Sequence, residues 1–352
     1  MINRFVSRFR VSSRCKRALV VGLLLCGLEF GVSPSVDAAA IITFDIPGAV
    51  EIYPQGINPA GVITGYFLDE SFVRHAFTRH RDGTITIFDA PGATDTVAFS
   101  INPAGAITGL YVDASSMGHG FLLEKNGAFV TFDAPSPAGT FPQSIAGRTI
   151  NPAGAIAGNY VDADRVTHGF LRATDGNITT IDIPGADRNG TNPSSMNPAG
   201  DITGFYYENG TTHGFLRSAD GTIILFDVPS ALLWTAAVSI NPAGAITGYY
   251  EAAPDSPNGF LRDADGTFTT FGVPGATATF PQSINPAEAI TGYYYDAEGV
   301  ARGFLRTRDG AVTVFEVEGA VSTFAYSLNA GGTITGYYID PSGRTLGFVR
   351  AN

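Results

Sequence analysis

The sequence predicts an all-β protein, a seven-bladed β-propeller of four-stranded antiparallel blades. Three observations lead to this prediction. The tetrapeptide Asn-Pro-Ala-Gly, or a close variant of it, recurs seven times at spacings of 44 to 49 residues, and this period is typical of propellers. Each unit holds four short runs rich in Ile, Val, Thr, Phe and Tyr, separated by Gly, Pro, Asn and Asp. No stretch of ten residues has the periodicity of a helix.

The first 40 residues differ in composition from the rest of the chain. Six basic residues precede an apolar run from Ala18 to Leu28, and small residues follow at Val36–Ala40. This order is typical of a secretory signal peptide, and the apolar run is shorter than the roughly 20 residues that cross a bilayer as a helix. We therefore expect residues 1–40 to be a signal peptide, residues 41–352 to be a single domain, and the protein to be secreted, either extracellular or periplasmic.

Cysteine and charge content limit the chemistry and the partners of the mature chain. Both cysteines, Cys15 and Cys26, lie in the predicted signal peptide, so disulfides, thiol catalysis and cysteine-ligated zinc are excluded for the mature chain. The signal peptide also holds 6 of the 21 basic residues and 2 of the 32 acidic ones, which leaves 15 basic and 30 acidic residues and a net charge of −15. So acidic a surface repels nucleic acid and anionic lipid. We expect a monomer with no nucleic-acid partner and no membrane span after signal cleavage.

The last two units show the predicted order of the strands. Thr323–Leu328 forms a first strand and Thr333–Ile339 a second, joined by Asn-Ala-Gly-Gly. In the unit before, Gly303–Arg306 forms a third strand and Ala311–Val317 a fourth, joined by an Asp-Gly turn. The Asn-Pro-Ala-Gly segments have the residue preferences of type I turns, and the Asp-Gly and Asn-Gly pairs those of hairpins.

The strand count predicts a closed ring. The Ile-Thr-Gly strand and the Gly-Phe strand each occur seven times, with small variations, and the last Gly-Phe strand has no fourth strand after it. Ile42–Ala49, near the start of the mature chain, is an orphan copy of a fourth strand. We expect it to pair into the last blade and close the ring. A solenoid would instead need atypical capping repeats.

Four histidines stand at equivalent places in the first four units, and other residues take that place in the last three. We interpret the histidines as structural ties to an acid five or six residues upstream, because a blade separates each one from the next. A metal or catalytic role is the alternative. Aromatic residues that recur once per blade, such as Phe121 and Tyr160, are interpreted as core, with a sugar-stacking platform as the alternative. The residues at the histidine position are His75, His119, His168, His213, Asn258, Arg302 and Leu346.

The histidines introduce the tripeptides His-Ala-Phe, at residues 75–77, and His-Gly-Phe, at residues 119–121, 168–170 and 213–215. In these motifs the chain resembles the bacterial extracellular HAF-repeat proteins, whose repeat is of similar length. The resemblance covers about Ile42 to Arg350, although three units lack the histidine. It implies a secreted, β-propeller-like repeat protein, and it supplies no activity or catalytic residue.

The binding site is expected on one face of the propeller. In a four-stranded blade the tight turns lie on one face, and the other two connections, where these units differ, lie on the opposite face. Acids open the first of those connections in most units, and we interpret them as loop caps, with a calcium site as the alternative. The candidate ligand face comprises Asp69, Asp113, Asp162, Glu208, Trp234, Asp296 and Asp340.

The sequence favours a binding or scaffolding propeller of unknown ligand over an enzyme. We find no converging acid–base pair and no metal-spaced group of His and Asp outside the repeated positions, so no catalytic residue, metal ligand or cofactor is predicted. An extracellular glycan or a protein is the expected ligand. The alternative is a secreted hydrolase or lyase acting on a carbohydrate or another extracellular substrate, because propeller enzymes draw single residues from several blades.

Overall fold

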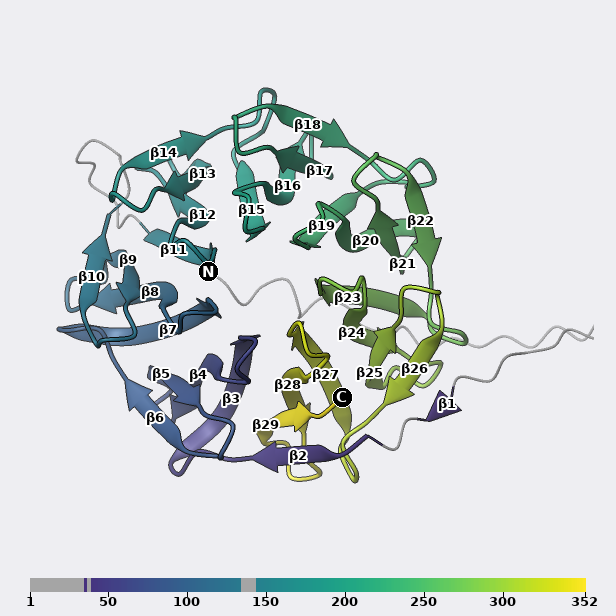
Figure 1. Cartoon of the computed structure of the whole chain (residues 1–352), viewed down its shortest axis with the longest axis horizontal. Coiled ribbons are helices and arrows are strands. Elements are labelled where there is room, and N and C mark those ends of the chain that lie inside the picture. Colours follow the sequence, from purple (N-terminus) through teal and green to yellow (C-terminus); the bar gives the residue numbers. More distant parts are fainter. Residues whose placement is uncertain (1–34, 37–38, 134–143) are drawn as a thin grey trace, which may run out of the picture. The chain divides into compact units, whose positions relative to one another are not determined.

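The computed structural model describes residues 35–36, 39–133 and 144–352. Most of the predicted signal peptide, including Cys15 and Cys26, lies outside the described residues. The described residues form strands and turns, and none of them forms a helix that could cross a bilayer. Within the unit Pro34–Asn352, the strands fall into sheets arranged around a common centre (Figure 1).

Each sheet repeats one antiparallel order of four strands, and Figure 1 shows the first strand of each nearest the centre. The first strands are β3 (Ala49–Ile57), β7 (Ala93–Ile101), β11 (Ser144–Ile150), β15 (Thr191–Met196), β19 (Thr235–Ile240), β23 (Ala278–Ile284) and β27 (Ser322–Leu328). The second strands are β4 (Ile63–Asp69), β8 (Ile107–Asp113), β12 (Ile156–Val161), β16 (Ile202–Glu208), β20 (Ile246–Ala253), β24 (Ile290–Tyr295) and β28 (Ile334–Ile339). The third strands are β5 (Arg74–Arg79), β9 (Gly118–Leu123), β13 (Thr167–Arg172), β17 (Thr211–Arg217), β21 (Ser256–Arg262), β25 (Ala301–Arg306) and β29 (Thr345–Arg350).

The fourth strands lie at the outer edge (Figure 1). They are β6 (Ile85–Phe88), β10 (Phe129–Phe132), β14 (Ile178–Ile181), β18 (Ile223–Phe226), β22 (Phe268–Phe271), β26 (Val312–Phe315) and β2 (Ile41–Phe44). A two-residue strand, β1 (Ser35–Val36), adds to β26 in parallel, and β3 and β29 share a single parallel residue pair. The all-β class and the repeated four-stranded antiparallel sheets predicted from the sequence are confirmed.

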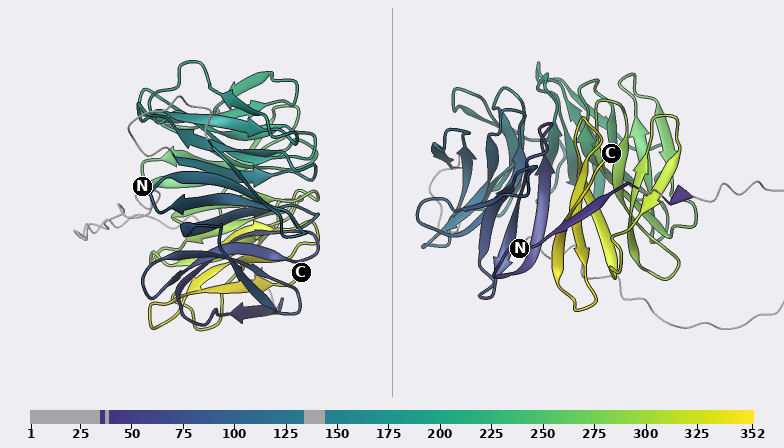
Figure 2. Two further views of the ribbon diagram at one scale, coloured as in Figure 1. Left: turned by 90° about the vertical axis from the view of Figure 1, so that its left-hand side faces the viewer. Right: turned by 60° about the horizontal axis from the view of Figure 1, so that its bottom comes forward.

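The connections between strands lie on two opposite faces of the unit (Figure 2). The turns from first to second strand and from third to fourth strand share one face, here called the tight-turn face. The loops from second to third strand and from each sheet to the next share the other, the variable-loop face. This division follows from the antiparallel order of the strands.

The N-terminal strand β2 pairs with β29, as the sequence predicts. The pairing is antiparallel and joins Ile41–Phe44 to Gly347–Arg350. An apolar cluster that includes Ile46, Ile52 and Leu346 fills the space between this last sheet and the first one. The first and last strands of the described domain therefore share one sheet and one core.

The packing of β2 matches that of fourth strands elsewhere. The ring of Phe44 lies under Arg79 of the next sheet, with the guanidinium carbon 5.0 Å from the ring centroid. Phe271 of β22 lies in the same way under Arg306, at 4.8 Å. Both rings also cover a glycine of the neighbouring third strand, where no Cβ would fit. The four-residue strand β2 is thus held by the same contacts as an internal fourth strand.

The Asn-Pro-Ala-Gly segments form the expected turns and also link the sheets. In one of them the Gly105 amide donates to the Asn102 carbonyl at 3.0 Å, and Asn102 Oδ1 accepts from the Ala106 amide at 2.9 Å. Gly105 has a φ of +92°, the left-handed conformation that favours glycine. Asn102 Nδ2 donates across the sheet boundary to the Asn151 carbonyl at 3.2 Å. The interpretation of these segments as turns alone was incomplete.

This link, called the Asn latch below, recurs around the unit. The same Nδ2-to-carbonyl bond joins Asn58 to Asn102, Asn241 to Asn285, Asn285 to Asn329, and Asn329 to Asn58. The last of these crosses from the final sheet to the first, at 3.1 Å. Asn197 departs from the pattern, because its Nδ2 donates to Asp201 in its own turn.

Candidate functional site

The acids predicted on the variable-loop face cap their own loops. Asp162 Oδ1 accepts from the Asp164 amide at 2.9 Å and from the Val166 amide at 2.8 Å. Despite partial burial, these bonds and a neighbouring histidine hold the pKa of Asp162 below its usual range. The same pair of capping bonds forms at Asp69, Asp113, Asp296 and Asp340. Each acid is engaged in its own sheet, so these residues do not converge on one site.

The other two predicted face residues behave differently. Glu208 makes no capping bond within the described residues, and its carboxylate lies so close to Gly185 of the preceding loop that a Cβ there would meet it at 2.7 Å. Trp234 immediately precedes β19, and its ring packs edge-on against Tyr249 of β20 at 5.6 Å. Of the predicted ligand-face residues, Trp234 is therefore the one whose side chain packs against the inner strands.

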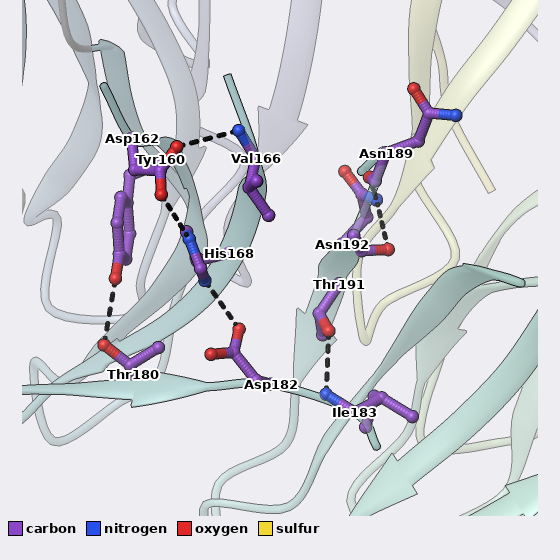
Figure 3. A network of polar contacts seen from close by, with 11 residues as sticks. Tyr160, Asp162, Val166, His168, Thr180, Asp182, Ile183, Asn189, Thr191 and Asn192 are labelled. Atoms are coloured by element: carbon purple, nitrogen blue, oxygen red, sulfur yellow. Dashed lines mark hydrogen bonds and ion pairs between the residues drawn. The ribbon is translucent and has the colours of Figure 1, made fainter. Parts of the chain in front are cut away.

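Three of the four histidines are held by two carboxylates, one more than expected, as Figure 3 shows for His168. His168 Nε2 lies 3.2 Å from Asp162 Oδ2, and its Nδ1 lies 2.8 Å from Asp182 Oδ1. Tyr160 stacks on the imidazole at 4.9 Å. Burial alone would lower the pKa of His168, but the bonds and charges of Asp182 and Asp162 outweigh it, and the pKa is raised.

The tie to the upstream acid is confirmed in three units and wrong in the fourth. His75 and His119 lie 3.6 Å and 3.4 Å from Asp69 and Asp113. His213 instead contacts Thr211 Oγ1 at 3.0 Å, because the loop there is shorter and Glu208 lies elsewhere. The sequence does not reveal the second partner, the Asp that directly follows the fourth strand, 14 residues downstream of each histidine: Asp89, Asp133, Asp182 and Asp227.

The last three units change this tie in different ways, and in the seventh Leu346 replaces the histidine although Asp340 and Asp45 remain. Arg302 replaces the histidine in the sixth unit and still bridges two acids, Asp296 and Glu316. In the fifth unit Asn258 replaces the histidine and Gly272 replaces the fourth-strand acid. Because an arginine in this place keeps both ion pairs, the role that these units share is to bind neighbouring strands together.

The aromatics that recur in every unit are core, as predicted. The phenylalanines of the third strands, such as Phe121 and Phe304, are fully buried. The tyrosines of the second strands, such as Tyr160 and Tyr250, are 5% exposed. These side chains fill the spaces between neighbouring sheets, so they do not form a surface platform.

The first strands share a feature that the sequence reading missed: each contains a β-bulge. In β11 the pairing with β12 shifts between Gly147 and Thr149, which leaves Arg148 as the extra residue. Bulges re-aim a side chain and are frequent beside functional sites. The seven extra residues are called the bulge positions below, and all are partly exposed: Gln55, Phe99, Arg148, Ser194, Val238, Gln282 and Tyr326.

Aromatic rings form a continuous chain across one half of the inner strands. From Trp234 to Tyr66, each ring lies between 4.8 and 5.6 Å from the next, and the contacts cross three sheet boundaries. Tyr326, at the bulge position of β27, contacts two members of the chain. This aromatic arc consists of Trp234, Tyr249, Phe280, Tyr293, Phe324, Tyr326, Tyr337, Tyr53 and Tyr66.

Every member of the aromatic arc is partly exposed, unlike the fully buried outer phenylalanines. Burial raises the pKa of Tyr66, Tyr249 and Tyr326 to about 12. It also raises the pKa of Tyr53, Tyr293 and Tyr337 well above the ordinary value of a tyrosine. The arc therefore presents neutral hydroxyls and aromatic faces together, a surface that can hydrogen-bond and stack.

Two charged residues adjoin the aromatic arc. Arg148 stacks on Phe99 at 4.6 Å, and burial lowers the pKa of its guanidinium while nearby Tyr66 acts in the opposite direction. Glu251 follows Tyr249 by two residues on β20 and is 7% exposed. Its Oε1 accepts from the Asp255 amide, whereas its buried Oε2 has no partner among the described residues.

The sequence does hold a signal for both residues, because each differs in type from the residues at the same position of the other units. Glu251 stands where the other units have Leu68, Val112, Val161, Tyr207, Tyr295 and Ile339. Arg148 stands where they have uncharged residues. Residues that break a repeat mark places where one unit does something the others do not. Neither residue belongs to a repeated motif, so the motifs do not reveal them.

Metal-ligating groups and surface hollows give no second candidate site among the described residues. No group of three or more His, Asp or Glu is arranged to hold a metal ion in the parts of the chain that the structure describes. One open hollow on the tight-turn face is lined by turn residues of a single sheet: Ala287, Ala289, Thr307, Arg308 and Asp309. Its arginine is already paired with Glu288 at 3.1 Å.

No family model and no curated protein matches the chain. Among solved structures, virginiamycin B lyase from Staphylococcus aureus is 15% identical, with a TM-score of 0.59 over 89% of this chain and 99% of that one. Puromycin hydrolase is 13% identical, with a TM-score of 0.56 over 88% of this chain and 56% of that one. The acylaminoacyl peptidase of Pyrococcus horikoshii is 12% identical, with a TM-score of 0.54 over 83% and 50%.

The chain spans about half the length of the last two structures and nearly all of the first. Identities this low carry fold and no activity. What the chain shares with all three is the β-propeller fold that its sequence predicts.

Proposed function

We propose that the chain is a secreted binding protein, a closed seven-bladed propeller that holds a saccharide on the aromatic arc. It would belong with the extracellular HAF-repeat proteins that its His-Gly-Phe units resemble. Closure is supported by the pairing of β2 with β29 and by the Asn latch between Asn329 and Asn58. Secretion is supported by the composition of residues 1–40.

The observation that carries the proposal is the one-sided distribution of the aromatic arc. Aromatics needed only for packing recur in every unit, as Phe121 and its equivalents do. The arc instead occupies the four neighbouring sheets of β3, β19, β23 and β27. At the position of Tyr249 the other three sheets have Leu110, Asn159 and Phe205. Within the described residues Phe205 contacts the ring of Tyr207 on its own strand and no ring of the arc.

A saccharide suits this surface better than a purely apolar ligand. Sugar rings have apolar faces that stack on aromatic side chains, while their hydroxyls need donors and acceptors. The arc supplies both, because most of its rings are tyrosines. Beside it, the unpaired Oε2 of Glu251 is an acceptor suited to a sugar hydroxyl.

The test is binding of a soluble glycan panel to the mature chain, followed by titration calorimetry of each hit. Trp234→Ala and Tyr326→Ala should each weaken binding at least tenfold, with the melting temperature checked to exclude unfolding. Phe72→Ala is the matched control, because Phe72 is 68% exposed on the variable-loop face and lies outside the arc. If Phe72→Ala weakens binding as much as Trp234→Ala, or no glycan binds, the proposal is wrong.

No observation favours the hydrolase or lyase alternative over binding. Catalysis of either reaction needs a positioned acid or base that acts together with a second group. Arg148 and Glu251 lie in different sheets, and no contact joins them within the described residues.

A further inference from the structure

Arg148 differs from the other residues at its repeat position. Among the bulge positions, which all lie in described strands, it carries the one charge. The other arginines with exposed guanidinium groups are often paired, as Arg74 is with Asp95 and Arg344 with Asp45. Arginines at the ends of third strands, such as Arg262 and Arg306, also form no ion pair among the described residues, but they recur in most units, whereas Arg148 interrupts the repeat.

The guanidinium of Arg148 is oriented but has no counter-ion. Its plane stacks on Phe99, and its Nε donates to Asn159 Oδ1 at 3.4 Å. No carboxylate in the described ranges forms an ion pair with it. Its two terminal nitrogens make no hydrogen bond there, and the residue as a whole is partly exposed. The edge that would bind a carboxylate is therefore open.

A second layer of bonds holds this arrangement in place. Asn159 Nδ2 donates to Asn192 Oδ1 at 3.1 Å. Asn192 Nδ2 in turn donates to the Asn189 carbonyl at 3.0 Å, in the loop before β15 (Figure 3). The chain of amides fixes the arginine from the neighbouring sheet. Such support is what keeps a binding group in a productive orientation.

Arg148 also adjoins the end of the aromatic arc. Phe99, on which it stacks, and Tyr66, the last ring of the arc, pack against the same apolar cluster of Val97, Leu110 and Ala146. A ligand that stacks on this end of the arc can therefore reach the guanidinium.

We propose that Arg148 binds the carboxylate of a uronate residue, so that the saccharide held by the arc is an acidic one. This inference rests on the proposed saccharide-binding function and names its substrate class. The planar fork of arginine matches a carboxylate with two parallel hydrogen bonds, and its partial burial strengthens the charge interaction. Because the rest of the domain repels anions, affinity for an acidic glycan would depend on this one group.

The test compares trigalacturonate with the uncharged galactotriose, by titration calorimetry on the mature chain. Wild type should bind trigalacturonate at least tenfold more tightly. Arg148→Gln should remove that preference and leave galactotriose binding unchanged, and Arg148→Lys should restore it only in part. Arg188→Gln is the matched control, since it removes the same charge from an exposed residue of the loop before β15 and should change neither affinity.

The possible results separate the two proposals. Wild type that prefers galactotriose, or an Arg148→Gln variant that keeps the preference for trigalacturonate, overturns the inference and leaves saccharide binding intact. Wild type that binds neither sugar, nor any member of the glycan panel, overturns both. Equal loss with Arg188→Gln would show that net charge, not the site, sets the preference, and would also overturn the inference.

Discussion

One asparagine side chain does two tasks in most of the repeated turns. Its Oδ1 accepts from an amide inside the turn, and its Nδ2 donates to the carbonyl of the next sheet. Asp lacks the donor and Ser is too short to provide both groups, so asparagine is the residue type that serves both needs. In Asn197 a nearby carboxylate, Asp201, takes the donor instead.

The histidine ties should make stability depend on pH. The folded-state pKa of His168 is raised above its ordinary value by Asp182 and Asp162, against the effect of burial. The resulting stabilisation is fully present below the unfolded-state pKa of about 6.5, and it is lost as pH rises through the folded-state pKa. We expect Asp182→Asn to lower stability by about 1 kcal/mol at pH 6 and by less at pH 9.

NMR titration of His168 provides the measurement. In the wild type its pKa should lie above that of a free histidine, and in Asp182→Asn it should fall, because burial then acts against one carboxylate instead of two. An unchanged pKa in the variant would mean that Asp182 does not hold the imidazole.

The Gly of the third strand in most units is explained by the ring that covers it. A Cβ on Gly303 would lie 2.5 Å from the ring of Phe315 in β26, so strand or ring would have to move. We expect Gly303→Ala to cost about 1–3 kcal/mol in urea unfolding. The first unit has Ala76 in place of this glycine, and its side chain is fully buried.

Ala76→Gly is the reciprocal variant. It removes a buried methyl group and should cost about 1 kcal/mol. If Gly303→Ala is as stable as wild type, the close packing of Phe315 is not what selects glycine there.

The strands could be predicted because each has a local cause: residues of high β-propensity between turn residues, repeated at a fixed period. The bulges could not, because the register shift in β11 depends on how two strands pair and leaves no mark on the composition of either. The second partner of His168 was missed for a similar reason, since Asp182 lies at the end of the neighbouring strand β14 and not in the loop before His168.

The aromatic arc could not be predicted from the sequence, because the packing of neighbouring sheets is what brings its rings together. The sequence shows that Tyr337 and Tyr53 are aromatic, and only the meeting of β28 with β3 brings their rings to 5.2 Å. Trp234 was predicted as part of the ligand face because the single tryptophan lies in one of the variable connections that follow a fourth strand. Arg148 and Glu251 were missed because they belong to no motif.

Closure of the ring can be tested with two matched phenylalanines. Phe44 of β2 and Phe271 of β22 occupy equivalent places under Arg79 and Arg306. If β2 closes the ring, Phe44→Ala and Phe271→Ala should cost similar amounts, about 2–4 kcal/mol each in urea unfolding. A Phe44→Ala variant as stable as wild type would show that the N-terminal strand is not part of the folded ring.

The Asn latch between the last and first sheets spans 271 positions, whereas the one between Asn58 and Asn102 spans 44. The entropic cost of closing a loop rises by about 0.6 kcal/mol for each doubling of loop length. In an unfolded chain the Asn329–Asn58 contact therefore costs about 1.6 kcal/mol more to form than the Asn58–Asn102 contact. Folding should therefore complete there last. Until β2 arrives, the edge of β29 and the apolar face of Phe77 stay open to other chains, so aggregation during folding should depend on how soon both ends meet.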